Sequence, residues 1–85
     1  MEEKIELRRK ARNLMPMINI GKNGLTDSLV KQIETIIKKK KLLKIKINKS
    51  ALENEDKKEI VRKIIEKTNA ELIDFIGFNV VIYKR

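Results

Sequence analysis

Apolar side chains recur at intervals of three and four residues in three stretches of the chain, which is the spacing of an amphipathic helix. The first stretch runs from Glu2 to Leu14. The second follows a cap at Thr26 or Asp27 and ends in the four lysines 38–41. The third ends at 68–69. We therefore expect three helices, whose buried faces carry Leu7, Ala11 and Leu14; Leu29, Val30, Ile33, Ile36 and Ile37; and Ile60, Val61, Ile64 and Ile65.

Two segments between these helices have the pattern of strands. Pro16 cannot sit inside a helix, so the chain should become extended from Met17 to Ile20. Apolar residues alternate with Lys44 and Lys46 between Leu43 and Ile47, which is the period of a strand with one buried face. The other face of this strand should then be exposed and cationic.

The C-terminal part of the chain predicts two more strands. Residues 71–76 and 78–83 are rich in β-branched and aromatic side chains and meet at Gly77, in a tight antiparallel hairpin or a bulged bend. The helix before these strands has two possible N-termini in the polar segment that ends at Asp56. One is a capping box at residues 50–53, and the other is an N-cap at Asp56.

The expected order of elements is α-β-α-β-α-β-β, in a single domain that spans residues 1–85. β-α-β units favour parallel neighbours joined by a right-handed crossover, and the final pair of strands should be antiparallel. We therefore expect an α/β fold, a two-layer sandwich with a four-stranded mixed sheet and three helices.

The charge balance points to a polyanionic partner. The chain has 21 Lys and Arg against 12 Asp and Glu, a formal net charge of +9, which attracts phosphate polyanions. An anionic membrane surface would attract it too, but no apolar run approaches the roughly 20 residues that span a bilayer. We expect nucleic acid as the partner, no membrane association, and a cytoplasmic protein that is neither secreted nor transmembrane.

The absence of cysteine and histidine narrows the chemistry. It excludes disulfides, thiolate metal sites, thiol nucleophiles and the usual proton-transfer side chain. We therefore expect no enzymatic activity, no metal and no cofactor. The acidic residues look like surface charges on separate elements: Asp27, Glu34, Asp56, Glu59, Glu66 and Asp74.

Basic residues gather on the first helix. Lys4, Arg8 and Arg12 are four apart and form one stripe, which Arg9 and Lys10 flank on the side opposite the buried seam. Such a stripe fits either a solvated helix face or a binding surface, and the near absence of acids after Glu6 favours binding.

A short glycine loop, Gly21-Lys22-Asn23-Gly24, stands between the first strand and the second helix. Glycines without a Cβ let the backbone approach a ligand, and the helix N-terminus that follows favours an anion such as phosphate. The loop is neither a nucleotide P-loop nor the dinucleotide fingerprint, so ATP or NAD binding is not expected. By its spacing alone, it could equally be a plain turn.

Three segments resemble one known family in the same order along the chain: INIGKNGLT at 18–26, LLKIKI at 42–47 and IDFIGFNVVIYKR at 73–85. The family is the CRM domain (chloroplast RNA splicing and ribosome maturation), also called YhbY-like. The resemblance implies a fold similar to the C-terminal domain of translation initiation factor three. It also implies that the GxxG loop contacts RNA as in KH domains, with stand-alone bacterial members associated with precursors of the large ribosomal subunit.

The resemblance carries over to Gly21 to Gly24, with Leu25 and Thr26 completing the motif. It also matches Lys44 and Lys46 to the family's basic strand. Many members have a lysine after the late glycine, where this chain has Phe78. The RNA contact of that lysine does not carry over, and the alternative is that an exposed Phe78 stacks on a base.

The leading hypothesis is that the loop clamps the backbone of structured RNA, ribosomal RNA during large-subunit assembly in particular. The RNA-binding residues would be Gly21, Lys22, Asn23, Gly24, Arg8, Arg9, Arg12, Lys44 and Lys46. One alternative is a ribosome-biogenesis adaptor whose main partner is a protein. Duplex DNA is the nearest competing ligand, because all nucleic acids share the electrostatic attraction.

Overall fold

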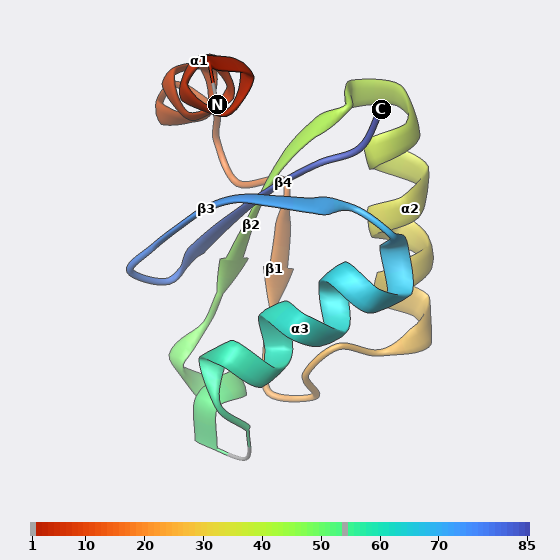
Figure 1. The fold of residues 1–85 in the computed structure, drawn as a ribbon. Helices are drawn as coiled ribbons and strands as arrows, with labels where there is room; N and C mark the ends of the chain where they lie inside the picture. Colours follow the sequence, from red (N-terminus) through yellow and green to blue (C-terminus); the bar gives the residue numbers. More distant parts are fainter. Residues whose placement is uncertain (1, 54) are drawn as a thin grey trace.

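A computed structural model describes residues 2–53 and 55–85 of the protein. Asn54, in the polar segment before the third helix, lies outside the described residues. Over these ranges the expected three helices and four strands occur in the expected order (Figure 1). A short 3₁₀ helix, η1, was not expected. The elements are α1 (Glu2–Arg12), β1 (Ile18–Ile20), α2 (Asp27–Lys40), β2 (Leu42–Ile47), η1 (Lys49–Glu53), α3 (Lys57–Thr68), β3 (Glu71–Ile76) and β4 (Asn79–Tyr83).

The four strands form one mixed sheet, as predicted, and their order in it is β1-β2-β4-β3. β1 pairs with β2 in parallel, and β4 pairs antiparallel with both β2 and β3. β2 and β3 therefore run in the same direction, but they are not neighbours. The hairpin places β4 between them, so only β1 and β2 are the directly paired parallel strands that the β-α-β units predicted.

The helix ends resolve the open alternatives of the sequence. Thr26 caps α2, because its Oγ1 accepts a hydrogen bond of 3.1 Å from the backbone N–H of Leu29. Asp56 occupies the N-cap position of α3, although its side chain makes no capping hydrogen bond. The alternative capping box lies in η1 instead. Asn69 ends α3 in the left-handed conformation, with φ of 56°.

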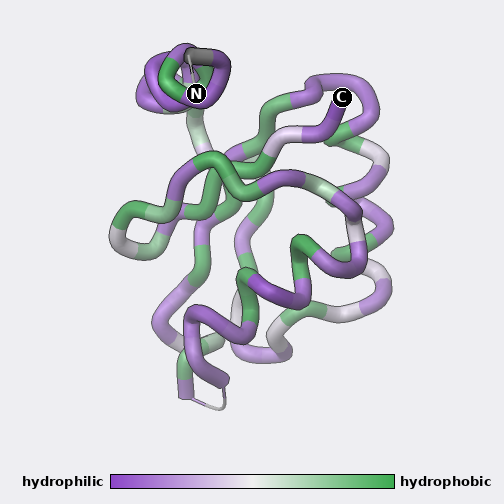
Figure 2. The backbone as a smooth tube through the Cα atoms, in the orientation of Figure 1, coloured by the Kyte–Doolittle hydropathy of each residue, from purple (hydrophilic) through white to green (hydrophobic). Residues whose placement is uncertain are grey.

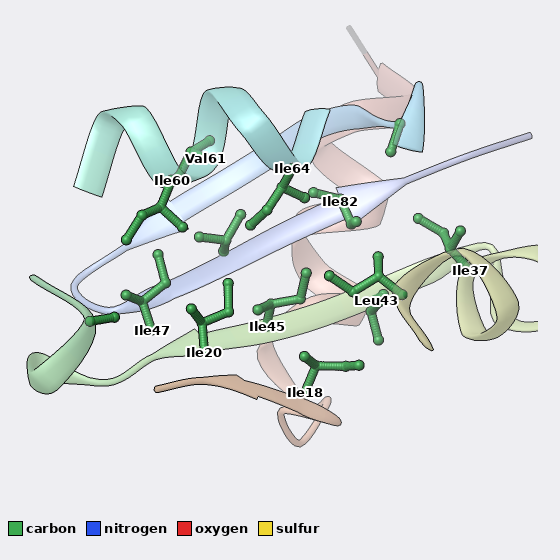
Figure 3. Packing of buried hydrophobic residues seen from close by; sticks show 14 residues of the cluster. Ile18, Ile20, Ile37, Leu43, Ile45, Ile47, Ile60, Val61, Ile64 and Ile82 are labelled. Atoms are coloured by element: carbon green, nitrogen blue, oxygen red, sulfur yellow. The ribbon is translucent and has the colours of Figure 1, made fainter. Parts of the chain in front are cut away.

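The main core lies between the sheet and the pair α2 and α3. Isoleucines of β1 and β2 point toward Ile60 and Ile64 of α3 (Figure 3). Ile20, Ile45 and Ile64 are each fully buried. In Figure 2 the tube is mostly hydrophilic along the outer turns of the helices and more hydrophobic in the strands. The sheet and these two helices form two layers of the fold, and α1, on the other face of the sheet, adds a third that the predicted two-layer sandwich did not include.

α1 covers the opposite face of the sheet from α2 and α3. Its buried residues Leu7 and Ala11 form a second, smaller cluster with Ile73 of β3 and Val81 of β4. Figure 1 shows α1 standing apart from the other two helices. The helix ends at Arg12, two residues before the predicted end.

β3 contains a bulge that the sequence did not locate. Leu72 pairs with Ile82 and Asp74 pairs with Val81, so Ile73 is the additional residue. The bend expected at Gly77 is a separate, tight turn, in which Gly77 has φ of 59°. Because a bulge re-aims the side chain that follows it, Asp74 turns toward the α1 side of the sheet, as the lining of a pocket beneath α1 shows.

Candidate functional site

The glycine loop forms a closed turn at the end of β1. The backbone N–H of Gly24 donates a hydrogen bond of 2.9 Å to the carbonyl of Gly21, and the N–H of Asn48 donates to the carbonyl of Ile20 at 2.9 Å. Both Lys22 and Asn23, between the glycines, are exposed. The loop thus presents one cation and one amide to solvent beside the N-terminus of α2.

The two glycines have different structural roles. Gly24 has φ of +69°, a conformation that residues with a Cβ rarely adopt, whereas Gly21 has no positive φ. Among the described residues, a Cβ on Gly21 would meet only the Asn48 Nδ2 atom, at 4.0 Å. The sequence could not show that the backbone conformation requires glycine at position 24 but not at position 21.

Gly24→Ala should therefore destabilise the fold by about 1–2 kcal/mol, the cost of a left-handed residue with a Cβ. Gly21→Ala, the matched control, should change the free energy of unfolding by less than about 0.5 kcal/mol. Urea unfolding followed by circular dichroism measures both. Equal destabilisation by the two substitutions would show that the backbone conformation of Gly24 is not the constraint.

An acidic side chain lies beside the loop. A Cβ on Gly24 would be 3.8 Å from the Glu55 Oε1 atom. The carboxylate of Glu55 forms an ion pair with Lys63 of α3, so its charge is partly balanced. Nothing in the sequence spacing indicated this neighbour, because Glu55 and the loop meet only in the folded chain.

The basic stripe of α1 lies beside the buried seam and not opposite it, which corrects the expectation from the sequence. The Lys4 Nζ atom is 3.6 Å from a carboxylate oxygen of Glu71, and Arg8 donates from Nε to the carbonyl of Ile73 at 3.0 Å. Their long side chains reach the edge strand β3 because α1 packs across it. Arg8 thereby satisfies a carbonyl of the bulged residue.

Lys44 is not on an open cationic face, which is a second correction. Its Nζ atom is 3.4 Å from the carbonyl oxygens of Ala11 and Leu14, at the C-terminal end of α1. A cation there interacts favourably with the negative end of the helix dipole. Lys46, two residues further along β2, is exposed as predicted.

The fold brings four of the predicted cations to one side of the sheet. Arg8, Arg12 and Lys44 line a common pocket under α1. Lys46 follows on the same strand face and pairs in register with Asn19 and Asn79. We call the surface formed by Arg8, Arg12, Lys44 and Lys46 the α1-side face.

The loop and Arg9 lie outside this face. The loop follows β1, whose last residue pairs with Ile47, three positions beyond Lys44. At about 3.3 Å per residue, this places the loop about 10 Å further along the sheet. Arg9 pairs with Glu6 on the exposed surface of α1, at 3.4 Å, and is not among the residues that line the pocket.

Phe78 is half-buried and covered by a cation. The Nζ atom of Lys57 lies 5.0 Å from the centroid of the Phe78 ring and 5.6 Å from that of Phe75. Lys57 also approaches the carbonyl of Gly77, at 3.5 Å. The ring therefore already has a cation–π partner within the protein.

The outer face of α3 differs from the α1-side face, because its arginine is paired with acids. Arg62 donates to Glu59 at 2.6 Å and to Glu66 at 2.7 Å. The hydrogen bond from Arg62 and its charge lower the pKa of the Glu59 carboxyl, and both carboxylates raise the pKa of Arg62. Because two carboxylates balance the charge of the Arg62 guanidinium, this residue contributes little to the attraction of a polyanion.

The described residues lack two other kinds of site. No group of three or more acidic side chains there is arranged to hold a metal ion. Over the same ranges, no helix has the length and apolar character needed to cross a bilayer.

These features define a small α/β domain with a glycine loop at the end of its sheet and a cationic face beneath its first helix. By sequence, the chain belongs to the family described as the CRS1 / YhbY (CRM) domain, which it matches over residues 1–84. The resemblance seen in its motifs is confirmed.

Similar proteins come from bacteria and archaea. The chain is 33% identical to a protein of Bacillus subtilis named as a probable RNA-binding protein, over 98% of this chain and 84% of that one. It is also 33% identical to a protein of Methanocaldococcus jannaschii with the same description, over 92% of this chain and only 58% of that one.

One solved structure has the same fold. It is the solution structure of a hypothetical Staphylococcus aureus protein, described as a candidate RNA-binding protein. The TM-score is 0.80 at 35% identity, and the match covers 99% of this chain and 85% of the other.

Proposed function

We propose that the protein binds RNA, with the α1-side face and the glycine loop holding successive parts of one backbone. The observation that carries this proposal is the gathering of Arg8, Arg12, Lys44 and Lys46 from two elements on one side of the sheet. Relatives named as RNA-binding proteins support RNA over other polyanions. No catalytic role is proposed.

The finer proposal is that the RNA is structured, and that it is ribosomal RNA of the large subunit during its assembly. Its support is the family to which the chain belongs. The scarcity of aromatic side chains fits this ligand, because base-by-base stacking on a strand needs a series of rings. Phosphate contacts and shape would then supply most of the affinity.

The test of the loop is the double substitution Lys22→Asp with Asn23→Asp, which lowers the formal net charge from +9 to +6. Its matched control is Lys39→Asp with Gln32→Asp, the same charge change on exposed positions of α2. Fluorescence anisotropy with structured RNA should show about 10-fold or greater weakening for the loop variant, because an attractive charge becomes repulsive. The control should retain most of the affinity.

Equal weakening by the two variants would mean that only the net charge matters and would overturn the role of the loop. Circular dichroism of each variant must first show the wild-type spectrum. Duplex DNA of equal length serves as the competing ligand, and equal affinity for RNA and DNA would contradict the preference for RNA.

A protein partner is the second candidate, favoured by two exposed methionines between α1 and β1. Met15 is 79% exposed and Met17 is 55% exposed, and flexible methionines suit adaptable protein contacts. This candidate predicts a stoichiometric protein that stays bound after nuclease treatment. Loss of all partners after nuclease would exclude it.

A further inference from the structure

A pocket of about 200 Å³ lies between α1 and the sheet face that α1 covers. The helix contributes Arg8 and Arg12, and β2 contributes Lys44. β3 and β4 contribute Asp74 and Asn79. Part of the remaining lining is apolar. A site with three cations, one carboxylate and one amide offers both donors and acceptors, which a plain phosphate site does not need.

Asp74 owes its place in this pocket to the β-bulge. It was expected to be a surface charge, but it is half-buried and lines the pocket together with the three cations. One of its oxygens, Oδ1, accepts a hydrogen bond of 2.9 Å from the N–H of Phe75. Among the described residues no cation lies within salt-bridge distance of it. Its carboxylate therefore retains acceptor capacity toward a ligand.

Asn79 supplies an independent indication. Its Oδ1 atom is buried and has no hydrogen-bond partner among the described residues. A buried polar atom without a partner is unfavourable in folded proteins, so a hydrogen bond that a ligand in the pocket offers to this side chain would be favourable. The carboxamide can present either its oxygen or its NH₂ group to that ligand by rotation.

The size of the pocket limits what it can hold. Pockets for drug-sized molecules measure about 300–1,000 Å³, so this one suits a smaller group. A single unstacked nucleobase is the part of an RNA that combines this size with hydrogen-bonding edges and an apolar ring.

We propose that the pocket binds one unstacked guanine of the RNA; this inference rests on the proposed RNA binding. Guanine carries two adjacent donors, N1–H and the N2 amino group, which match the carboxylate of Asp74. Its O6 and N7 are acceptors for an ammonium group such as that of Lys44. Adenine, cytosine and uracil lack the pair of adjacent donors.

The position of the pocket fits the same RNA segment that the loop would hold. Lys46 follows Lys44 along β2, on the way to the end of the sheet where the loop lies. A backbone running from the loop past Lys46 would bring one of its bases to the pocket. The loop and the exposed cation position the strand, and the pocket selects the base.

The experiment uses hairpin RNAs that differ only at one nucleotide of an otherwise all-uridine loop. The variable nucleotide is guanosine, inosine, adenosine or cytidine, and binding is measured by fluorescence anisotropy with the full chain. We expect guanosine to bind about 10- to 100-fold more tightly than adenosine or cytidine. Inosine, which lacks only the N2 amino group, should lose a large part of this preference.

The protein variant that tests the pocket is Asp74→Asn, which keeps the shape and the acceptor for the Phe75 N–H. This substitution should abolish the preference for guanosine over inosine. The variant should bind the other hairpins at least as tightly as wild type does. Glu34→Gln, the same charge change on α2, is the control and should leave the preference intact. An isotope-edited spectrum should show the Asn79 side-chain amide shift on binding the guanosine hairpin only.

Equal affinity of wild type for all four hairpins, or a guanosine preference that persists in Asp74→Asn, would overturn the guanine pocket and leave RNA binding in place. Failure to bind any of the hairpins, or any larger structured RNA, would overturn the proposed function and the pocket together.

Discussion

Ile45→Ala is expected to lower the free energy of unfolding by about 2–5 kcal/mol, the range for removing a large aliphatic side chain from a packed core. Ile45 is fully buried in β2, between the paired strands β1 and β4 and beneath the helical layer. Domains of this size are stable by only about 4–13 kcal/mol, so one truncation removes a large part of the total.

The control is Ile76→Ala, the same truncation in a strand position that is 64% exposed. It should change stability by no more than about 0.5 kcal/mol. Urea unfolding of both variants, followed by circular dichroism, gives the comparison. A loss below about 1 kcal/mol for Ile45→Ala would contradict the placement of this residue at the centre of the core.

RNA affinity is expected to fall about 50- to 150-fold when salt rises from 50 to 200 mM. Four of the basic residues predicted to bind RNA are exposed in the structure and available for phosphate contact: Lys22, Arg8, Arg12 and Lys46. Each neutralised phosphate adds about 0.7 to 0.9 to the magnitude of the negative slope of log affinity against log salt, so four contacts give a slope of about −2.8 to −3.6. Arg9 is left out because its charge is paired with Glu6, and Lys44 because it is half-buried; Arg8 is kept because it is exposed and its bond to the neutral carbonyl of Ile73 leaves its charge unbalanced.

Anisotropy titrations across a salt series measure this slope. Arg12→Met should make it shallower by about one, and Lys39→Met, on the opposite helical layer, should leave it unchanged. A wild-type slope weaker than about −1 would contradict backbone binding by the α1-side face. An equal effect of the two substitutions would show that binding depends on net charge and not on this surface.

The positions of the helices and strands could be predicted because they depend on local periodicity. Intervals of three and four located α2 and α3, and alternation with Lys44 and Lys46 located β2. Thr26 was predicted as one of two caps, since a hydroxyl there satisfies an N–H that the helix itself leaves free. Such signals lie within a few residues of the structure they determine.

The candidate site could be predicted only in part. The residue types and the loop could be read from the chain, and the family confirms the resemblance on which the loop was selected. The contacts that these residues make with the rest of the fold could not be predicted from the sequence. Glu55 beside the loop, Arg8 on the carbonyl of Ile73, and Lys44 at the end of α1 are contacts between residues far apart in sequence.

By itself, the sequence determined three amphipathic helices, four strands, a cationic chain without cysteine or histidine, and a glycine turn that leads into a capped helix. Only the tertiary structure decided that α1 covers the far face of the sheet and that β4 inserts between β2 and β3. It also decided that a bulge directs the side chain of Asp74 into the pocket under α1. The physical reason is that periodicity specifies which side of an element is buried, whereas its partner is chosen by how all the buried faces pack together.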